Sequence, residues 1–179
     1  MPAFQWAVME ANLDPVAGSE HHLRRGDPHT LRQGCAPRWL RLEAIPYARE
    51  TLTALRPGWI VALATNAVDS GEAEIRDALA HVQLDECVDK VFCYQQVGSK
   101  KPSPRFFAFI LSDLGLDPSR VTMVGDNYEE DVLGANRSGL RAVWFNPRSE
   151  ADSSGEMLRT IHDLRELEGI LGEWAPGTD

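Results

Sequence analysis

The sequence predicts an α/β protein with a parallel sheet, and two observations support this fold class. Between residues 46 and 172, short apolar runs alternate with segments of helical periodicity, as in strands joined by crossover helices. The apolar runs are continuous and do not alternate with polar residues, which is typical of strands covered on both faces. We therefore expect a three-layer core with a parallel sheet between helices.

Five apolar runs are candidate strands because each is short and bounded by polar or turn-forming residues. They span residues 4–9, 59–64, 91–94, 121–124 and 142–145. All but the first have the composition of buried strands. The sequence thus predicts a sheet of at least five strands.

Helices are predicted between these runs, where apolar residues recur three or four positions apart. The expected buried faces are Ala48, Leu52 and Leu55, then Ile75, Leu79 and Val82, and then Phe106, Phe109, Ile110 and Leu114. A last stripe predicts a C-terminal amphipathic helix and consists of Leu158, Ile161, Leu164, Leu167 and Leu171.

Length and composition indicate one globular domain over residues 1–179. The chain is 43% hydrophobic and 25% charged, which excludes disordered and fibrous classes. Its net charge of −9 argues against a nucleic acid or an anionic membrane as partner. The longest apolar run, residues 59–64, is far below the ~20 residues that span a bilayer. No secretory signal is recognisable, so we expect a cytoplasmic protein.

Residues 18–45 differ from the rest of the chain because they show no long periodic face and are rich in arginine. This irregular insert holds five arginines against three acidic residues. It is either a solvated loop or a cover that attracts an anionic ligand.

Three polar clusters follow predicted strands, at the edge where open parallel sheets place their ligand sites. Thr65 and Asn66 follow the second strand, Lys101 lies in a turn ahead of a helix, and Asp126 and Asp131 follow the fourth strand. A threonine hydroxyl and a lysine can bind an anionic oxygen, and carboxylates suit a hard cation such as Mg²⁺. Taken singly, each could instead be a helix cap, a surface charge or a first-turn acid.

Taken together, these clusters resemble motifs of the haloacid dehalogenase (HAD) superfamily, and most closely the 2-haloacid dehalogenase and phosphoglycolate phosphatase-like subfamily. Thr65 matches the second motif, Lys101 the third, and Asp126 with Asp131 the fourth. The resemblance covers residues 46–172. It implies a Rossmann-like HAD core, a phosphatase-type pocket and Mg²⁺ as cofactor.

The first motif of the family is altered in this chain. The resemblance implies an Asp-x-Asp after the first strand, which supplies a nucleophile and a general acid/base, but no Asp-x-Asp occurs in the sequence. Our alignment places Glu10 at the nucleophile, Asn12 at the acid/base and Asp14 at a following threonine. It implies Glu10, Asn12, Asp126 and Asp131 as metal-binding residues, Asn12 through its backbone carbonyl.

These replacements predict weak or lost hydrolysis through an aspartyl-phosphate. A catalytic group misplaced by about 1 Å can lose about 10²-fold in rate, and loss of a general acid/base costs roughly 10²–10⁴. Glu10, Asn12, Asp14, Thr65 and Lys101 remain the candidate catalytic residues, while Thr65, Asn66 and Lys101 are the candidate ligand-binding residues. The alternatives are a non-catalytic binding or regulatory protein and a non-covalent reaction with Glu10 or Asp14 as base.

The family's cap is predicted to be absent or vestigial. Only about 30 residues separate Asp14 from the helix expected near Tyr47, and the insert at residues 18–45 stands in place of the cap. The expected partner at this open cleft is a small anionic ligand, phosphorylated or carboxylated, or another protein.

Overall fold

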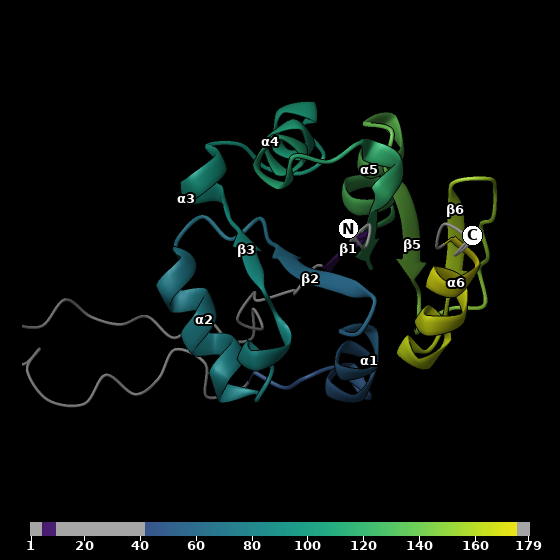
Figure 1. Ribbon diagram of the computed structural model, residues 1–179, viewed down its shortest axis with the longest axis horizontal. Coiled ribbons are helices and arrows are strands. Elements are labelled where there is room, and N and C mark those ends of the chain that lie inside the picture. Colours follow the sequence, from purple (N-terminus) through teal and green to yellow (C-terminus); the bar gives the residue numbers. More distant parts are fainter. Residues whose placement is uncertain (1–4, 10–41, 175–179) are drawn as a thin grey trace, which may run out of the picture.

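A computed structural model of the chain describes residues 5–9 and 42–174. Within these residues, six parallel strands form one sheet in the order β3-β2-β1-β4-β5-β6 (Figure 1). The strands are β1 (Gln5–Met9), β2 (Trp59–Ala64), β3 (Lys90–Phe92), β4 (Val121–Gly125), β5 (Arg141–Phe145) and β6 (Leu158–Ile161). The predicted α/β class with a parallel sheet is confirmed.

Helices occupy both faces of this sheet. The α-helices are α1 (Ala48–Leu55), α2 (Glu72–His81), α3 (Tyr94–Val97), α4 (Pro104–Leu114), α5 (Gly134–Arg137) and α6 (Leu167–Trp174). Shorter helical turns are η1 (Asp85–Cys87), η2 (Pro118–Arg120), the π-helical η3 (Tyr128–Leu133) and η4 (Leu164–Glu166). In Figure 1, α4 and α5 lie on one face, and α1, α2 and α6 lie on the other.

The strand β1 lies in the middle of the sheet and fixes where a ligand site can form. Met9 is aligned with Leu63 of β2 on one side and with Val124 of β4 on the other. From β1, the chain adds β2 and β3 on one side of the sheet and later adds β4, β5 and β6 on the other side. Open α/β sheets bind ligands at such a switch point, beyond the carboxyl ends of the strands.

The strand β2 illustrates why the continuous apolar runs form central strands. Alternate side chains of a strand point to opposite faces, so Val61 and Leu63 pack with the cluster under α1 and α2. Ala62 and Ala64 pack with the cluster under α4, which contains the fully buried Phe106. Both faces are thus apolar, and the run needs no polar positions.

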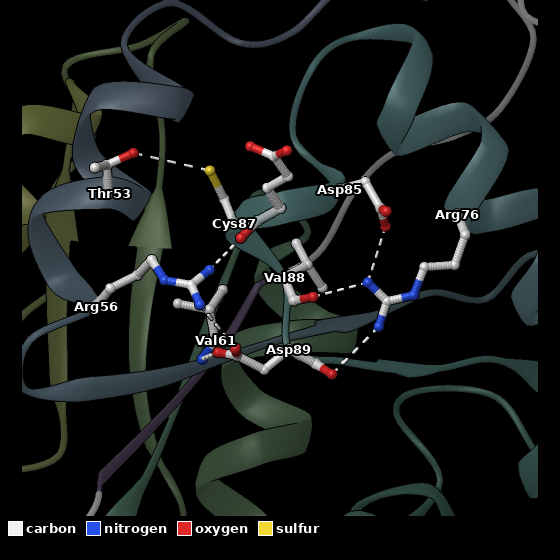
Figure 2. A network of polar contacts seen from close by, with 9 residues as sticks. Thr53, Arg56, Val61, Arg76, Asp85, Cys87, Val88 and Asp89 are labelled. Atoms are coloured by element: carbon white, nitrogen blue, oxygen red, sulfur yellow. Dashed lines mark hydrogen bonds and ion pairs between the residues drawn. The ribbon is translucent and has the colours of Figure 1, made fainter.

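A polar network holds the amino ends of β2 and β3 together, at the edge of the sheet opposite the candidate site (Figure 2). The guanidinium of Arg76 donates to Asp85 Oδ1 at 2.9 Å, to Val88 O at 2.7 Å and to Asp89 O at 3.2 Å. Asp89 Oδ2 in turn accepts from the backbone N–H of Val61 at 2.9 Å. These bonds join α2, η1 and both strands and have a structural role.

The predicted C-terminal helix is partly wrong. Residues 158–161 form β6, which pairs with β5 in parallel, and the helical part begins only at η4 and α6. Asp163 caps η4 by accepting from the N–H of Arg165 at 2.9 Å, and Glu166 completes a capping box. This box starts a new element inside the stripe that we had interpreted as one helix.

Two smaller expectations also need correction. The predicted strand at residues 91–94 is β3, and Tyr94 already begins α3. On α4, Phe107 is buried, whereas Phe109 is 37% exposed and touches Phe92 edge-on. The face of α4 that packs on the sheet therefore contains Phe106, Phe107 and Ile110.

Most of the insert at residues 18–45 lies outside the described residues, and residues 42–45 contain neither helix nor strand. Among the described helices, none combines the length and the apolar character needed to cross a bilayer. The single-domain organisation over residues 1–179 stays a prediction.

Candidate functional site

Thr65 follows the last residue of β2, at the edge of the sheet predicted to bind a ligand. Its side chain and backbone are almost completely buried, with 3% of the residue exposed. The backbone N–H donates to Phe92 O at 2.9 Å, and Oγ1 accepts from the N–H of Ala67 at 3.2 Å. Because the oxygen accepts that bond, the hydroxyl proton can be donated to an anionic oxygen.

Lys101 extends its side chain to the same strand end from the turn that precedes α4. Its ammonium donates to Ala64 O at 3.1 Å and lies 2.8 Å from Asp131 Oδ1. Both the lysine and the aspartate side chains have no exposed area. The predicted third and fourth motifs are thus joined by a fully buried ion pair.

Asp131 is held from the other side by the segment that follows β4. Its Oδ2 accepts from the N–H of Asn127 at 3.1 Å, while its Oδ1 takes part in the ion pair with Lys101. Gly125 makes room for this carboxylate, because a Cβ on Gly125 would lie only 2.4 Å from Asp131 Oδ2. The close approach of Asp131 therefore explains why the residue before Asp126 is a glycine.

Asn66 was predicted as a ligand-binding residue, but its side-chain amide forms hydrogen bonds within the protein. Its Oδ1 accepts from the N–H of Lys101 at 2.8 Å, and its Nδ2 donates to Lys101 O at 3.2 Å and to Glu130 Oε2 at 3.0 Å. Asn66 thus fixes the backbone of Lys101. Glu130, an acidic residue of the turn after β4, reaches the site through this contact.

Asp126 differs from Asp131 because it is exposed. Its backbone carbonyl accepts from the indole N–H of Trp144 at 3.1 Å, which fixes the main chain directly after β4. Within the described residues, the carboxylate of Asp126 makes neither a hydrogen bond nor an ion pair. It is a hard oxygen donor of the kind that Mg²⁺ binds.

The described residues do not complete a metal site by themselves. They contain no group of three or more His, Cys, Asp or Glu side chains suited to hold a metal ion. Glu10, Asn12 and Asp14, which we predicted as ligands or catalytic groups, lie outside the described residues, and Glu10 is the next residue in the chain after Met9. Asp126 therefore fits a hard cation as one ligand among several.

The fold and the site define a class: a parallel α/β protein with a hydroxyl, a buried lysine and two carboxylates at its switch point. The model of the family described as haloacid dehalogenase-like hydrolase matches residues 4–139. The chain belongs to this family, and the resemblance predicted from Thr65, Lys101, Asp126 and Asp131 is confirmed.

Curated relatives include several phosphatases. The chain is 38% identical over 116 residues to a phosphoserine phosphatase of Thermus thermophilus. The aligned region covers 64% of this chain and 45% of the relative. It is 33% identical over 129 residues to the pyrimidine 5'-nucleotidase YjjG of Escherichia coli, covering 71% of this chain and 56% of the relative. The chain thus spans about half the length of these relatives.

Solved structures agree with the fold. A HAD phosphatase from Thermococcus onnurineus superposes with a TM-score of 0.59 at 34% identity, covering 72% of this chain and 58% of that one. An uncharacterized protein from Listeria monocytogenes gives a TM-score of 0.74 over 96% of this chain and 98% of its own. At 22% identity, the second likeness shows the fold alone.

Proposed function

We propose that this chain binds a phosphorylated small molecule at the carboxyl ends of β2 and β4 and hydrolyses it slowly. The observation that carries the proposal is the buried ion pair between Lys101 and Asp131, beside Thr65. A buried ion pair contributes little net stability, because the desolvation of both charges offsets their attraction. Its position at the switch point therefore favours a role in binding an anion.

Each of the three residues has a distinct part in this proposal. The hydroxyl of Thr65 donates to a phosphate oxygen, and the ammonium of Lys101 neutralises charge on the same group. Asp131 positions Lys101, since its two oxygens face Lys101 Nζ and the N–H of Asn127. This positioning role is our alternative to the metal-ligand role that the resemblance implies for Asp131.

A divalent cation suits the charge of the site. With Lys101 paired to Asp131, the exposed carboxylate of Asp126 leaves the strand-end edge negative, which opposes the binding of a phosphate. We propose Asp126, Glu10 and the backbone carbonyl of Asn12 as the residues that hold Mg²⁺. When bound, Mg²⁺ would neutralise charge on the phosphate.

Slow turnover follows from the two residues that replace the family's aspartates. Glu10 is one methylene longer than aspartate, and a misplacement of about 1 Å can cost about 10²-fold. Asn12 cannot exchange a proton near neutral pH, and a missing general acid/base costs roughly 10²–10⁴ in rate.

The test compares phosphate release from p-nitrophenyl phosphate by the native chain and by the Glu10→Asp/Asn12→Asp variant, both with millimolar Mg²⁺. We expect the variant to be at least about 100-fold faster. The matched control adds Asp126→Asn to the double variant and should remove the gain. An unchanged rate in the double variant would contradict the alignment that places Glu10 and Asn12 in the site.

A further inference from the structure

A pocket of about 500 Å³ opens beside Asp126, on the β5 and β6 side of the candidate site. Its walls are residues 45–47, which precede α1, residues 145–148, at and after the end of β5, and residues 162–164, after β6. A volume of this size is in the range of small-molecule sites. Among the described residues, Asp126 is the only predicted site residue that lines it.

The walls of the pocket combine apolar surface with a few polar groups. Ile45 and Tyr47 are 41% and 43% exposed and form the outer apolar part, and Phe145 and Leu164 form the deeper apolar part. Such a mixture suits a ligand with a short carbon skeleton and one or two charged ends.

The carboxylate of Asp163, which lines the pocket, already has a partner in Arg165. Arg165 binds Asp163 through Nε at 2.9 Å and Nη2 at 2.8 Å, and this bonding lowers the pKa of Asp163 to about 2. The guanidinium of Arg165 also lies over the ring of Tyr47, 4.0 Å from its centroid. Asp163 is therefore neutralised by its neighbour, and the guanidinium of Arg165 is held between Asp163 and Tyr47.

His162 is likewise oriented by the protein. Its Nδ1 lies 2.7 Å from Asn146 O, and because a carbonyl oxygen only accepts, Nδ1 carries the proton. Its Nε2 lies 3.6 Å from Asp152 Oδ1. The ring is thus held between a backbone carbonyl and a carboxylate and shapes the wall of the pocket.

Arg148 is the cation that these contacts leave without a counterion. It is exposed, it lines the pocket, and it forms no ion pair with any described residue. Asp126 lines the same pocket and is the proposed metal ligand next to the phosphate position. If the pocket were spherical, it would be roughly 10 Å across, so one small ligand can contact both residues.

We propose that this pocket binds the organic part of the phosphorylated ligand, and that Arg148 binds a second anionic group on it, a carboxylate or another phosphate. Arginine recognises both groups through paired N–H donors. The proposal rests on the proposed function and adds to it a substrate class, namely small phosphomonoesters that carry a second negative charge at the far end of a short carbon chain.

The test measures the binding of non-hydrolysable phosphonates to the full chain by calorimetry, with millimolar Mg²⁺. Methylphosphonate reports the phosphate position alone, while phosphonoacetate, phosphonopropionate and phosphonobutyrate add a carboxylate at increasing distance. Methylenediphosphonate represents a second phosphate, and phenylphosphonate represents a neutral apolar group. We expect one of the doubly charged probes to bind about tenfold or more tightly than methylphosphonate.

The decisive variant is Arg148→Gln, which keeps a polar side chain at the exposed position. It should remove the gain from the second charge and leave methylphosphonate binding unchanged. The matched control is Arg137→Gln, since Arg137 is exposed and paired with Glu129 at 2.8 Å on α5, away from the pocket. This control should leave both affinities unchanged.

Each other outcome overturns a particular statement. If Arg148→Gln leaves the gain intact, or if phenylphosphonate binds as tightly as the doubly charged probes, the role of Arg148 is rejected and the phosphate site stands. If methylphosphonate and the doubly charged probes all fail to bind, the proposed function and this inference are both rejected.

Discussion

The side-chain amide of Asn66 forms two hydrogen bonds with the backbone of Lys101. Its Oδ1 accepts from the N–H at 2.8 Å, and its Nδ2 donates to the C=O at 3.2 Å. The two residues are 35 positions apart in the chain. This pairing joins the segment after β2 to the turn before α4. It therefore holds the backbone of Lys101 at the end of β2, where the ammonium contacts Ala64 O.

Removal of the Asn66 amide should loosen this turn. Asn66→Ala leaves the partly buried N–H of Lys101 without its acceptor, and we expect the free energy of unfolding to fall by about 1–3 kcal/mol. Asn66→Asp should be worse, because it places a carboxylate near Lys101 O and Glu130 Oε2, both of which now accept from Nδ2. Urea denaturation of both variants measures the difference, and equal stability of Asn66→Asp and the native chain would contradict the pairing.

Neutralisation of Asp131 should be costly. Asp131→Asn removes the negative charge that lies 2.8 Å from the buried ammonium of Lys101, and breaking a buried pair in this way costs about 3–5 kcal/mol. The control is Glu129→Gln on the same turn, because the pair of Glu129 and Arg137 is more than half exposed and is worth about 0–1 kcal/mol. Denaturant unfolding should therefore separate the two variants clearly, and similar losses in both would count against the burial of Lys101.

Gly125 should not tolerate a side chain. A Cβ there would lie 2.4 Å from Asp131 Oδ2, so Gly125→Ala must displace the carboxylate, and overpacking of this kind costs about 1–3 kcal/mol. Gly169→Ala in α6 is the matched control, because nothing lies within 4 Å of the added Cβ and alanine favours a helix over glycine by up to about 1 kcal/mol. Melting temperatures should thus move in opposite directions, and an unchanged value for Gly125→Ala would refute the close approach.

Binding of Mg²⁺ should stabilise the native chain if Asp126 is a ligand. A ligand that binds only the folded state raises the melting temperature as its concentration rises above its Kd. Asp126→Asn is expected to fold normally, since Asp126 is exposed, and to lose the shift. Differential scanning fluorimetry with and without EDTA measures the effect. A shift of equal size in both proteins would place the cation elsewhere.

Acid should reveal the contact between Asp163 and Arg165. Hydrogen bonds from the side chain and the N–H of Arg165 lower the pKa of Asp163 from 3.8 to about 2. Because the folded state holds the proton more weakly than the unfolded state, the ionised carboxylate favours folding above about pH 4, and this contribution is lost between about pH 4 and pH 2. NMR titration of Asp163 should show the low pKa, and Arg165→Gln should return it toward 3.8.

The central part of the fold could be predicted from the sequence because its strands are buried on both faces. The run at residues 59–64 is confirmed residue for residue as β2, and the runs at 121–124 and 142–145 are each one residue shorter than β4 and β5. The strand β6 was missed because it lies at the sheet edge, where only Ile161 of its four residues is buried. Leu158 and Ile161 are three apart, a spacing that fits a helix equally well.

The location of two candidate site residues was predictable from the sequence, and their contacts were not. Thr65 and Lys101 lie at one strand end as expected, since both motifs follow strands of one parallel sheet. Sequence could not show that Asn66 faces the Lys101 backbone or that Asp131 is buried while Asp126 is exposed, because these depend on the π-helical course of η3. The ligand-binding role that we propose for Arg148 could not be predicted, because a lone arginine after a strand carries no recognisable spacing.

The middle position of β1 has a consequence for how the chain folds. Gln5–Met9 precedes the other described strands in the chain, yet it pairs with β2, which begins at Trp59, and with β4, which begins at Val121. The pairing of β1 on both sides can therefore be complete only after β4 has been synthesised, and such long sequence separations slow folding. A truncated chain without the first nine residues would expose two unpaired strand edges, those of β2 and β4, and should aggregate.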